Sequence, residues 1–111
     1  MIVSSNHELF QKLVPAVCEI YGDNLISIIL YGSVARNEAT EDSDIDIAFL
    51  VKNDTYELHD KMLDVIVELN LEYDQLISPL LIEIDKFNKW RNVMPYYINI
   101  EREGIVLWKA A

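Results

Sequence analysis

Hydrophobic and polar positions along this chain follow two different periods. Apolar residues that recur three and four positions apart predict amphipathic helices, whereas short and nearly continuous apolar runs predict buried strands. Glycines at the ends of such segments are typical stops. In chain order, the expected elements are a helix over 5–21, a strand over 25–31, a helical turn over 34–37, a strand over 43–51, a helix that begins within 54–57, a strand over 71–84, helices over 86–93 and 95–103, and a strand over 105–108.

The two long helices carry the clearest signals. Ser5-Asn-His-Glu8 is a capping box, and Asp54-Thr-Tyr-Glu57 is a second helix start. Pro15 should bend the first helix or remove one of its hydrogen bonds, and Gly22 should end it. Each helix has one apolar stripe for a core: Phe10, Leu13, Val14, Val17 and Tyr21 on the first, and Leu58, Met62, Val65, Ile66 and Leu69 on the second.

The alternation of helices and strands is typical of an α/β or α+β domain with one sheet. We expect a mixed sheet of three or four strands that helices cover on one side. Pro79 suits an edge strand or a bulge, because proline cannot donate a hydrogen bond to a strand ladder. The 111 residues, 1–111, are enough for a single domain with one core, but not for a second recognition domain.

The most informative motif joins the first two strands. Gly32-Ser33 leaves an apolar strand, and Asp44-Ile45-Asp46 opens the next strand after ten residues. A Gly-Ser turn lets the backbone approach a phosphate with no Cβ in the way, and it adds one hydroxyl. Two carboxylates at i and i+2 on a strand project from one face and converge. Magnesium prefers such oxygen ligands together with substrate phosphates, so the motif predicts a nucleotide and metal site.

A plain β-hairpin with an acidic, solvated loop is the structural alternative. Aspartate is depleted in strands, however. Here Asp44 and Asp46 share one strand face with Ala48 and Leu50. The other face is wholly apolar and consists of Ile45, Ile47, Phe49 and Val51. This pattern favours a functional pair of carboxylates.

The segment resembles the minimal nucleotidyltransferase (MNT) family, a branch of the polymerase-beta-type nucleotidyltransferases. Its signature is Gly-Ser, ten residues and Asp-x-Asp, with an Ala-Arg pair that Ala35-Arg36 matches and a Ser-Asp-Ile-Asp run that 43–46 matches. The segments 71–79 and 102–105 also look like the second half of single-domain members. Asn37 stands where the family commonly has glycine, and asparagine tolerates a left-handed backbone better than most residues. The resemblance implies a polymerase-beta-like nucleotidyltransferase fold.

The resemblance also implies a third carboxylate at the start of the strand after the long helix. Asp74 matches that position, and Glu72 is the alternative ligand. In this interpretation Asp44 and Asp46 bridge two Mg²⁺ ions on ATP, and Asp74 binds the ion beside the acceptor hydroxyl, where it would also take the hydroxyl proton. The plain interpretation of Asp74 is an exposed residue near a strand end.

Two residues near the Gly-Ser turn are candidate nucleotide ligands. Ser33 would hold the β or γ phosphate through its hydroxyl and amide, in addition to its part in the turn. Arg36 would reach the triphosphate with its fork of donors. The alternative for Arg36 is an ion pair with Glu38 or Glu41 on the surface.

Composition narrows the function classes. Nine Lys and Arg against nineteen Asp and Glu give a net charge of −10, which repels a polyanion, so a template-directed polymerase or a direct nucleic-acid binder is not expected. The single cysteine, Cys18, fits a reducing compartment and is expected to pack in the core. No apolar run approaches the length of a membrane span, and the start lacks the basic flank of a secretion signal. We therefore expect a cytoplasmic protein without membrane contact.

The family resemblance implies the reaction, which is transfer of AMP from ATP to an acceptor hydroxyl. Lone MNT domains resemble the antitoxin half of HEPN/MNT toxin–antitoxin pairs, in which the MNT protein adenylylates a tyrosine of its HEPN ribonuclease partner. The resemblance thus implies a HEPN-domain toxin as partner, and assembly as a homo- or hetero-oligomer is compatible with it. Two alternatives stay open: the catalytic subunit of a small-molecule, aminoglycoside-like nucleotidyltransferase, and an antitoxin that neutralises its partner by binding alone.

Overall fold

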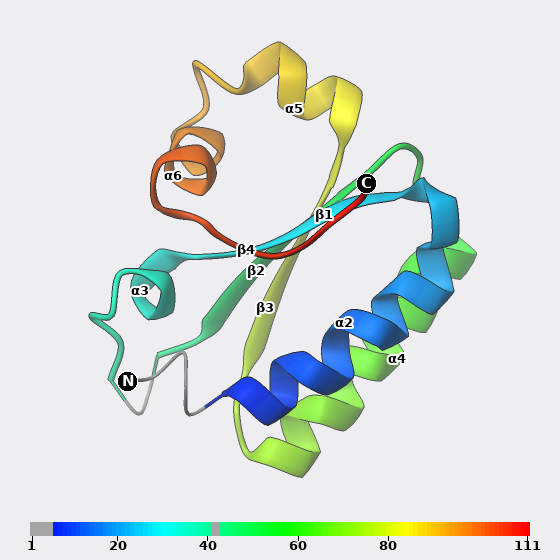
Figure 1. Cartoon of the computed structure of the whole chain (residues 1–111), viewed down its shortest axis with the longest axis vertical. Coiled ribbons are helices and arrows are strands. Elements are labelled where there is room, and N and C mark those ends of the chain that lie inside the picture. Colours follow the sequence, from blue (N-terminus) through cyan, green and yellow to red (C-terminus); the bar gives the residue numbers. More distant parts are fainter. Residues whose placement is uncertain (1–5, 41–42) are drawn as a thin grey trace.

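The computed structural model describes residues 6–40 and 43–111. Figure 1 shows a sheet between two pairs of helices. In chain order, the elements are α2 (His7–Tyr21), η1 (Gly22–Asn24), β1 (Leu25–Tyr31), α3 (Gly32–Ala35), β2 (Ile45–Val51), α4 (Tyr56–Tyr73), β3 (Ile77–Glu83), α5 (Ile84–Trp90), α6 (Pro95–Glu103) and β4 (Ile105–Lys109).

The sheet has four strands in the order β3-β2-β1-β4. The prediction of a mixed sheet with three or four strands is confirmed. The central strand β1 is antiparallel to both β2 and β4, whereas β3 is parallel to β2. A parallel pair needs a long crossover, and α4 provides it. Pro79 lies in β3, which is an edge strand, so the prediction from proline is confirmed.

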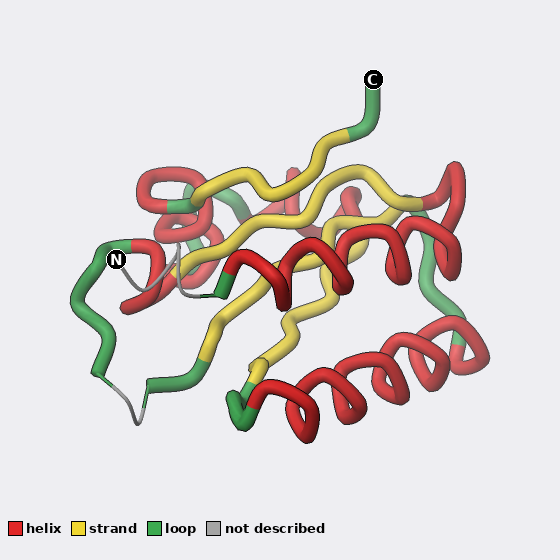
Figure 2. Tube along the Cα trace, turned by 60° about the horizontal axis from the view of Figure 1, so that its bottom comes forward, coloured by secondary structure: helices red, strands yellow, loops and turns green. Residues whose placement is uncertain are grey.

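Helices cover both faces of the sheet, and the expectation of one covered face is wrong. The pair α2 and α4 packs on one face, where the two helices lie side by side (Figure 2). On the other face, α5 and α6 pack over β3 and β1 around a smaller cluster that contains Ala48 and Leu50. The alternation along β2 explains this arrangement, because Ile47 and Phe49 point to the first core while Ala48 and Leu50 point to the second.

The predicted helix signals have mixed outcomes. Thr55 is the N-cap of α4, and its hydroxyl accepts a hydrogen bond from the Leu58 N–H at 3.2 Å. Gly22 ends α2 with a φ of 55°, and Pro15 lies within that helix. The capping box of α2 begins at Ser5, which lies outside the described residues. Cys18 is only partly buried and packs at the margin of the core, where burial raises the pKa of its thiol.

The strand expected over 71–84 is the main error in the local prediction. The segment 71–73 continues α4, which ends where Asp74 adopts the left-handed conformation with a φ of 50°. The Asn70 side chain accepts a hydrogen bond from the Ile77 N–H at 2.9 Å and so fixes the turn into β3. Ile84 already begins α5. Smaller shifts affect α3, which occupies 32–35 instead of 34–37, and β2, which begins at Ile45 instead of Ser43.

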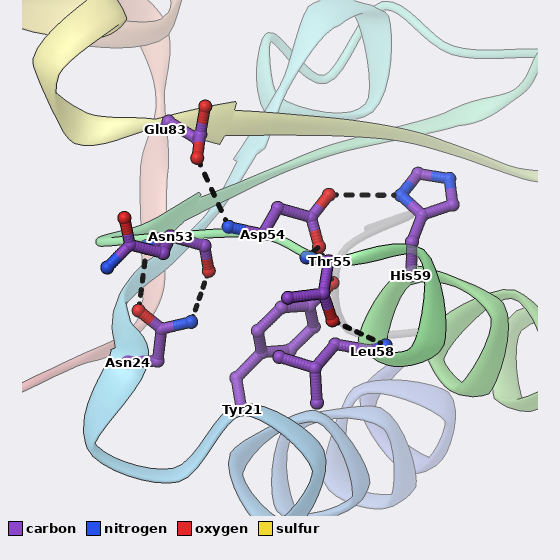
Figure 3. A network of polar contacts seen from close by, with 8 residues as sticks. All are labelled: Tyr21, Asn24, Asn53, Asp54, Thr55, Leu58, His59 and Glu83. Atoms are coloured by element: carbon purple, nitrogen blue, oxygen red, sulfur yellow. Dashed lines mark hydrogen bonds and ion pairs between the residues drawn. The ribbon is translucent and has the colours of Figure 1, made fainter.

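A polar network closes the end of the sheet where β2 finishes (Figure 3). The Asn24 side chain accepts from the Asn53 N–H at 2.7 Å and donates to the Asn53 carbonyl. Asp54 accepts a hydrogen bond from the Tyr21 hydroxyl at 3.0 Å, and its own N–H donates to Glu83 at 3.2 Å. These contacts join α2, β3 and the start of α4. No helix in the described part of the chain is long and apolar enough to cross a membrane.

Candidate active site

The candidate site lies at the opposite end of β2, where β1 leads into α3. Tyr31 pairs with Asp46 across the antiparallel ladder, and the chain then turns at Gly32 with a φ of 75°. A Cβ added at Gly32 would lie 2.3 Å from Asp46 Oδ2, which is closer than real Cβ atoms come to any heavy atom. Position 32 therefore requires glycine for two reasons, the left-handed backbone and the space that the carboxylate occupies.

The structure brings the two predicted aspartates together. Asp46 is half-buried and projects to the α5 and α6 face with Ala48, whereas Asp44 is exposed one residue before β2. Burial raises the pKa of Asp46, and the nearby negative charge of Asp44 raises it further, while Arg36 acts in the opposite direction. The pair is thus a point of concentrated negative charge with incomplete compensation, which favours a bound cation.

Arg36 is held in ion pairs of its own. Its guanidinium lies 3.2 Å from a carboxylate oxygen of Glu38 and 3.0 Å from one of Glu103. The pair with Glu38 is the surface alternative that the sequence offered, while Glu41 lies outside the described residues. The pair with Glu103 ties α3 to the end of α6. Asn37 has a φ of 59°, so this asparagine does adopt the left-handed conformation that its place in the motif requires.

Ser33 lies in α3, directly after Gly32. Its carbonyl accepts a hydrogen bond from the Glu38 N–H at 2.9 Å, which holds the loop against α3. The residue is partly exposed, and it follows Gly32, against which the Asp46 carboxylate lies. Ser33 thus has the structural part that was expected of it, and its role toward phosphate stays a prediction.

The third predicted carboxylate, Asp74, was expected at the start of a strand, but it does not lie on one. Asp74 is exposed at the C-cap of α4, three residues before β3. Glu72 is still within α4, and its ion pair with Lys12 holds the pKa of the Glu72 carboxyl below its usual range. Within residues 6–40 and 43–111, no group of three His, Cys, Asp or Glu side chains is arranged to hold a metal. The geometry therefore joins Asp44 and Asp46 but does not bring Asp74 to them.

Two residues that the sequence did not single out flank Asp46. Tyr31 is its partner on β1 and Ser78 is its partner on β3. Burial raises the pKa of Tyr31, as do the charge of Asp46 and the neighbouring Tyr96 of α6. Ser78 is identified by the parallel pairing of β2 with β3. That pairing could not be predicted without knowing that β3 begins at Ile77.

The donor set fits magnesium. Mg²⁺ takes oxygen ligands and is usually bound through one or two carboxylates plus substrate phosphates. Asp44 and Asp46 supply two carboxylates at one place, and burial together with the charge of Asp44 raises the pKa of Asp46, a cost that a bound cation would relieve. The residues present therefore suit an ion that arrives with a nucleotide.

Comparison with known families decides the class of this site. A family model described as a nucleotidyltransferase domain matches residues 10–106, which is most of the chain. The chain therefore belongs to the nucleotidyltransferase domain family. The matched segment contains Gly32, Ser33, Asp44 and Asp46, the residues from which the family resemblance was inferred.

Curated relatives carry the same class of activity in their names. The chain is 32% identical over 104 residues to "Putative protein adenylyltransferase MJ0604" of Methanocaldococcus jannaschii, and this match covers 94% of the chain and 99% of the relative. It is 42% identical over 66 residues to "Putative protein adenylyltransferase MJ1305" of the same organism, which covers 57% of this chain. Because that match covers only 45% of MJ1305, the chain spans less than half the length of that relative.

Solved structures share the fold of this nucleotidyltransferase domain. A toxin–antitoxin structure with AMP-PNP superposes with a TM-score of 0.61 at 17% identity and covers 91% of this chain and 73% of that chain. A complex of the tri-AMPylated Shewanella oneidensis HEPN toxin with its MNT antitoxin gives a TM-score of 0.55 at 17% identity, with 93% and 72% covered. The predicted nucleotidyltransferase fold is thereby confirmed.

Proposed function

We propose that this nucleotidyltransferase domain transfers AMP from ATP to a tyrosine hydroxyl of a HEPN-domain partner protein, with Mg²⁺ as cofactor. The observation that carries the proposal is the carboxylate pair Asp44 and Asp46, with Asp46 seated against the bare backbone of Gly32. The names of the curated relatives support protein as the acceptor, and the AMP-PNP complex of a similar fold supports ATP as the donor.

In this nucleotidyl transfer the acceptor oxygen bonds to the α-phosphorus, and the bond from that phosphorus to the oxygen bridging to the β-phosphate breaks. Pyrophosphate leaves, and the proton of the acceptor hydroxyl passes to solvent. Bound magnesium would polarise the phosphate oxygens and neutralise the charge that develops on them. Asp44 and Asp46 would hold that ion, and the Gly32-Ser33 turn would orient the β and γ phosphates through its backbone and the Ser33 hydroxyl. Since no covalent nucleophile is required, positioning supplies most of the rate enhancement.

Arg36 and Asp74 have weaker support. Arg36 would reach the triphosphate only by leaving Glu38 or Glu103, although its charge already acts on Asp46. Asp74 is predicted by resemblance as the third ligand, and its place at the end of α4 gives that role no support. Asp74→Asn is therefore an informative variant, because an unchanged transfer rate would remove it from the site.

The proposed partner follows from charge and fold together. A domain with a net charge of −10 should associate with a basic protein surface, and a ribonuclease needs basic surface to hold RNA. The MNT antitoxin with a similar fold occurs in a complex with an AMPylated HEPN toxin. We accordingly infer a cytoplasmic antitoxin that modifies its toxin within a hetero-oligomer.

The test is the intact mass of a HEPN-domain protein co-expressed with this chain. Each AMP adds about 329 Da, and the addition should disappear with Asp44→Asn and Asp46→Asn combined, because the metal site is then lost. A partner that stays unmodified but is still neutralised by the double variant would overturn the catalytic proposal and favour a binding antitoxin. Modification of an aminoglycoside-like alcohol, with no change in the protein, would favour a small-molecule enzyme.

A further inference from the structure

Ser78 is the immediate neighbour of Asp46 on the β3 side. The parallel register pairs Asp46 with Ser78, Ala48 with Leu80 and Leu50 with Ile82. Leu80 and Ile82 pack with Ala48 and Leu50 in the cluster below α5 and α6, so Ser78 shares this face of the sheet with Asp46. Neighbouring strands lie about 4.8 Å apart, so the side chains of Ser78 and Asp46 leave adjacent positions on the same face of the sheet.

The other candidates for an oxygen ligand beside Asp46 are less well placed than Ser78. On the β1 side, Tyr31 is half-buried and packs against the apolar cluster that contains Ala48 and Leu50. Asp74 belongs to the α4 cap, where its left-handed backbone ends the helix and its N–H bonds to the Asn70 carbonyl. The acidic residues that precede β3, Glu72 and Asp74, thus lie outside the row of strand residues that crosses the site.

We propose that Ser78, and not Asp74, is the third side-chain oxygen of the metal site. The proposal deepens the proposed function, since it concerns the same Mg²⁺ and ATP. It means that this chain holds the cation with two carboxylates and one neutral hydroxyl. Affinity for divalent cations rises with the number of charged ligands, so the apo site should be a weak binder that depends on the nucleotide phosphates.

The decisive variant is Ser78→Asp, which would add a carboxylate beside Asp46. We expect the full chain to bind Mn²⁺, used as the probe in place of Mg²⁺, about tenfold more tightly without nucleotide. Ser78→Asn is the matched control, because it adds the same volume with no charge, and it should not tighten binding. Asp74→Asn should leave Mn²⁺ binding unchanged, whereas Asp46→Asn should abolish it. Electron paramagnetic resonance of free Mn²⁺ measures all four.

A second measurement tests the placement of Ser78 without any metal. Ser78→Asp places a new carboxylate next to Asp46, so it should lower the stability of the folded apo protein. Asp46→Asn should restore that stability. The double-mutant coupling between positions 78 and 46 should be about fivefold in the unfolding equilibrium constant. Ser78→Asn should show no such coupling.

The two measurements test different claims: the coupling tests the placement of Ser78, and Mn²⁺ binding tests the metal site. Absence of coupling, or loss of Mn²⁺ binding in Asp74→Asn, would overturn the assignment of Ser78. Clear coupling with no Mn²⁺ binding even by Ser78→Asp would confirm that the two positions are neighbours but overturn the metal site, and with it the proposed function.

Discussion

An aspartate lies near each end of β2, and the surroundings of the two differ. Asp46 is the second residue of the strand, and Asp54 follows its last residue by three positions. At the far end, Asp54 accepts hydrogen bonds from the Tyr21 hydroxyl at 3.0 Å and the Thr55 N–H at 2.9 Å, and it lies 3.4 Å from His59 (Figure 3). At the near end, Asp46 faces a second carboxylate while half-buried, and its pKa is raised. A carboxylate with several donors stabilises a fold, whereas one kept beside a like charge indicates a ligand that the fold itself does not supply.

The largest expected effect is the loss of AMP transfer when both aspartates of the candidate site are replaced. Asp44→Asn combined with Asp46→Asn should lower AMP transfer about a thousandfold or more, because the groups that hold the metal are lost. The apo fold should be as stable as the wild type or slightly more stable, since a repulsion is removed. Radiolabelled-ATP transfer and chemical denaturation measure the two effects. Wild-type transfer by the double variant would show that the site lies elsewhere.

Gly32→Ala should weaken nucleotide binding strongly. The new Cβ would meet Asp46 Oδ2 at 2.3 Å, and the φ of 75° adds backbone strain. Gly22→Ala is the matched control, because Gly22 also has a positive φ, of 55°, but no atom lies within 4 Å of the added Cβ. Isothermal titration with ATP and Mg²⁺ should show a much larger rise in Kd for Gly32→Ala than for Ser33→Ala, which removes one hydroxyl worth about 0.5–1.5 kcal/mol. Equal effects of these two would mean that the turn is purely structural.

Asp54→Asn should produce the opposite phenotype from the aspartate pair. Transfer activity per folded molecule should persist, while the free energy of unfolding should fall by about 1–2 kcal/mol, since the carboxylate that accepts hydrogen bonds from the Tyr21 hydroxyl and the Thr55 N–H loses its charge. Urea denaturation beside the transfer assay separates the two ends. An Asp54→Asn protein of normal stability but without activity would contradict the comparison.

The stability difference between Asp46→Asn and wild type should depend on pH. Because the folded state raises the pKa of Asp46 above its ordinary value of 3.8, the ionised carboxylate costs stability at neutral pH. As the pH falls through the raised pKa toward 3.8, protonation removes that cost, so the advantage of Asp46→Asn should shrink. Denaturation midpoints of the apo proteins between pH 7 and about 4 would measure this. An advantage that grows in acid would reverse the assigned sign.

The smallest expected effect concerns Asn37. Its φ of 59° should make Asn37→Ala less stable by about 1 kcal/mol, whereas Asn37→Gly should be nearly neutral. Thermal unfolding with both variants tests this. Equal stability of the alanine and glycine variants would argue against a left-handed backbone at this position.

Local patterns in the sequence were enough for much of this protein. The strand 25–31 and the helix 95–103 have the predicted bounds, and the family resemblance that the Gly32-Ser33 and Asp44-x-Asp46 motif carries is confirmed by the family match. These predictions succeed because periodicity, helix stops and a motif within fifteen residues act over short distances in the chain. The metal and phosphate roles of that motif are still predictions.

Tertiary structure alone decided which side chains surround the carboxylate pair. The segment 71–73 is compatible with helix or strand, and only packing of α4 against α2 extends the helix to Tyr73 and leaves Asp74 in its cap. Once β3 begins at Ile77, the parallel register places Ser78 beside Asp46, and α6 brings Glu103 to Arg36. Such neighbours depend on pairing between distant segments, because the register of a parallel strand is set by the crossover and by the core that it buries, and not by the residues of the strand itself.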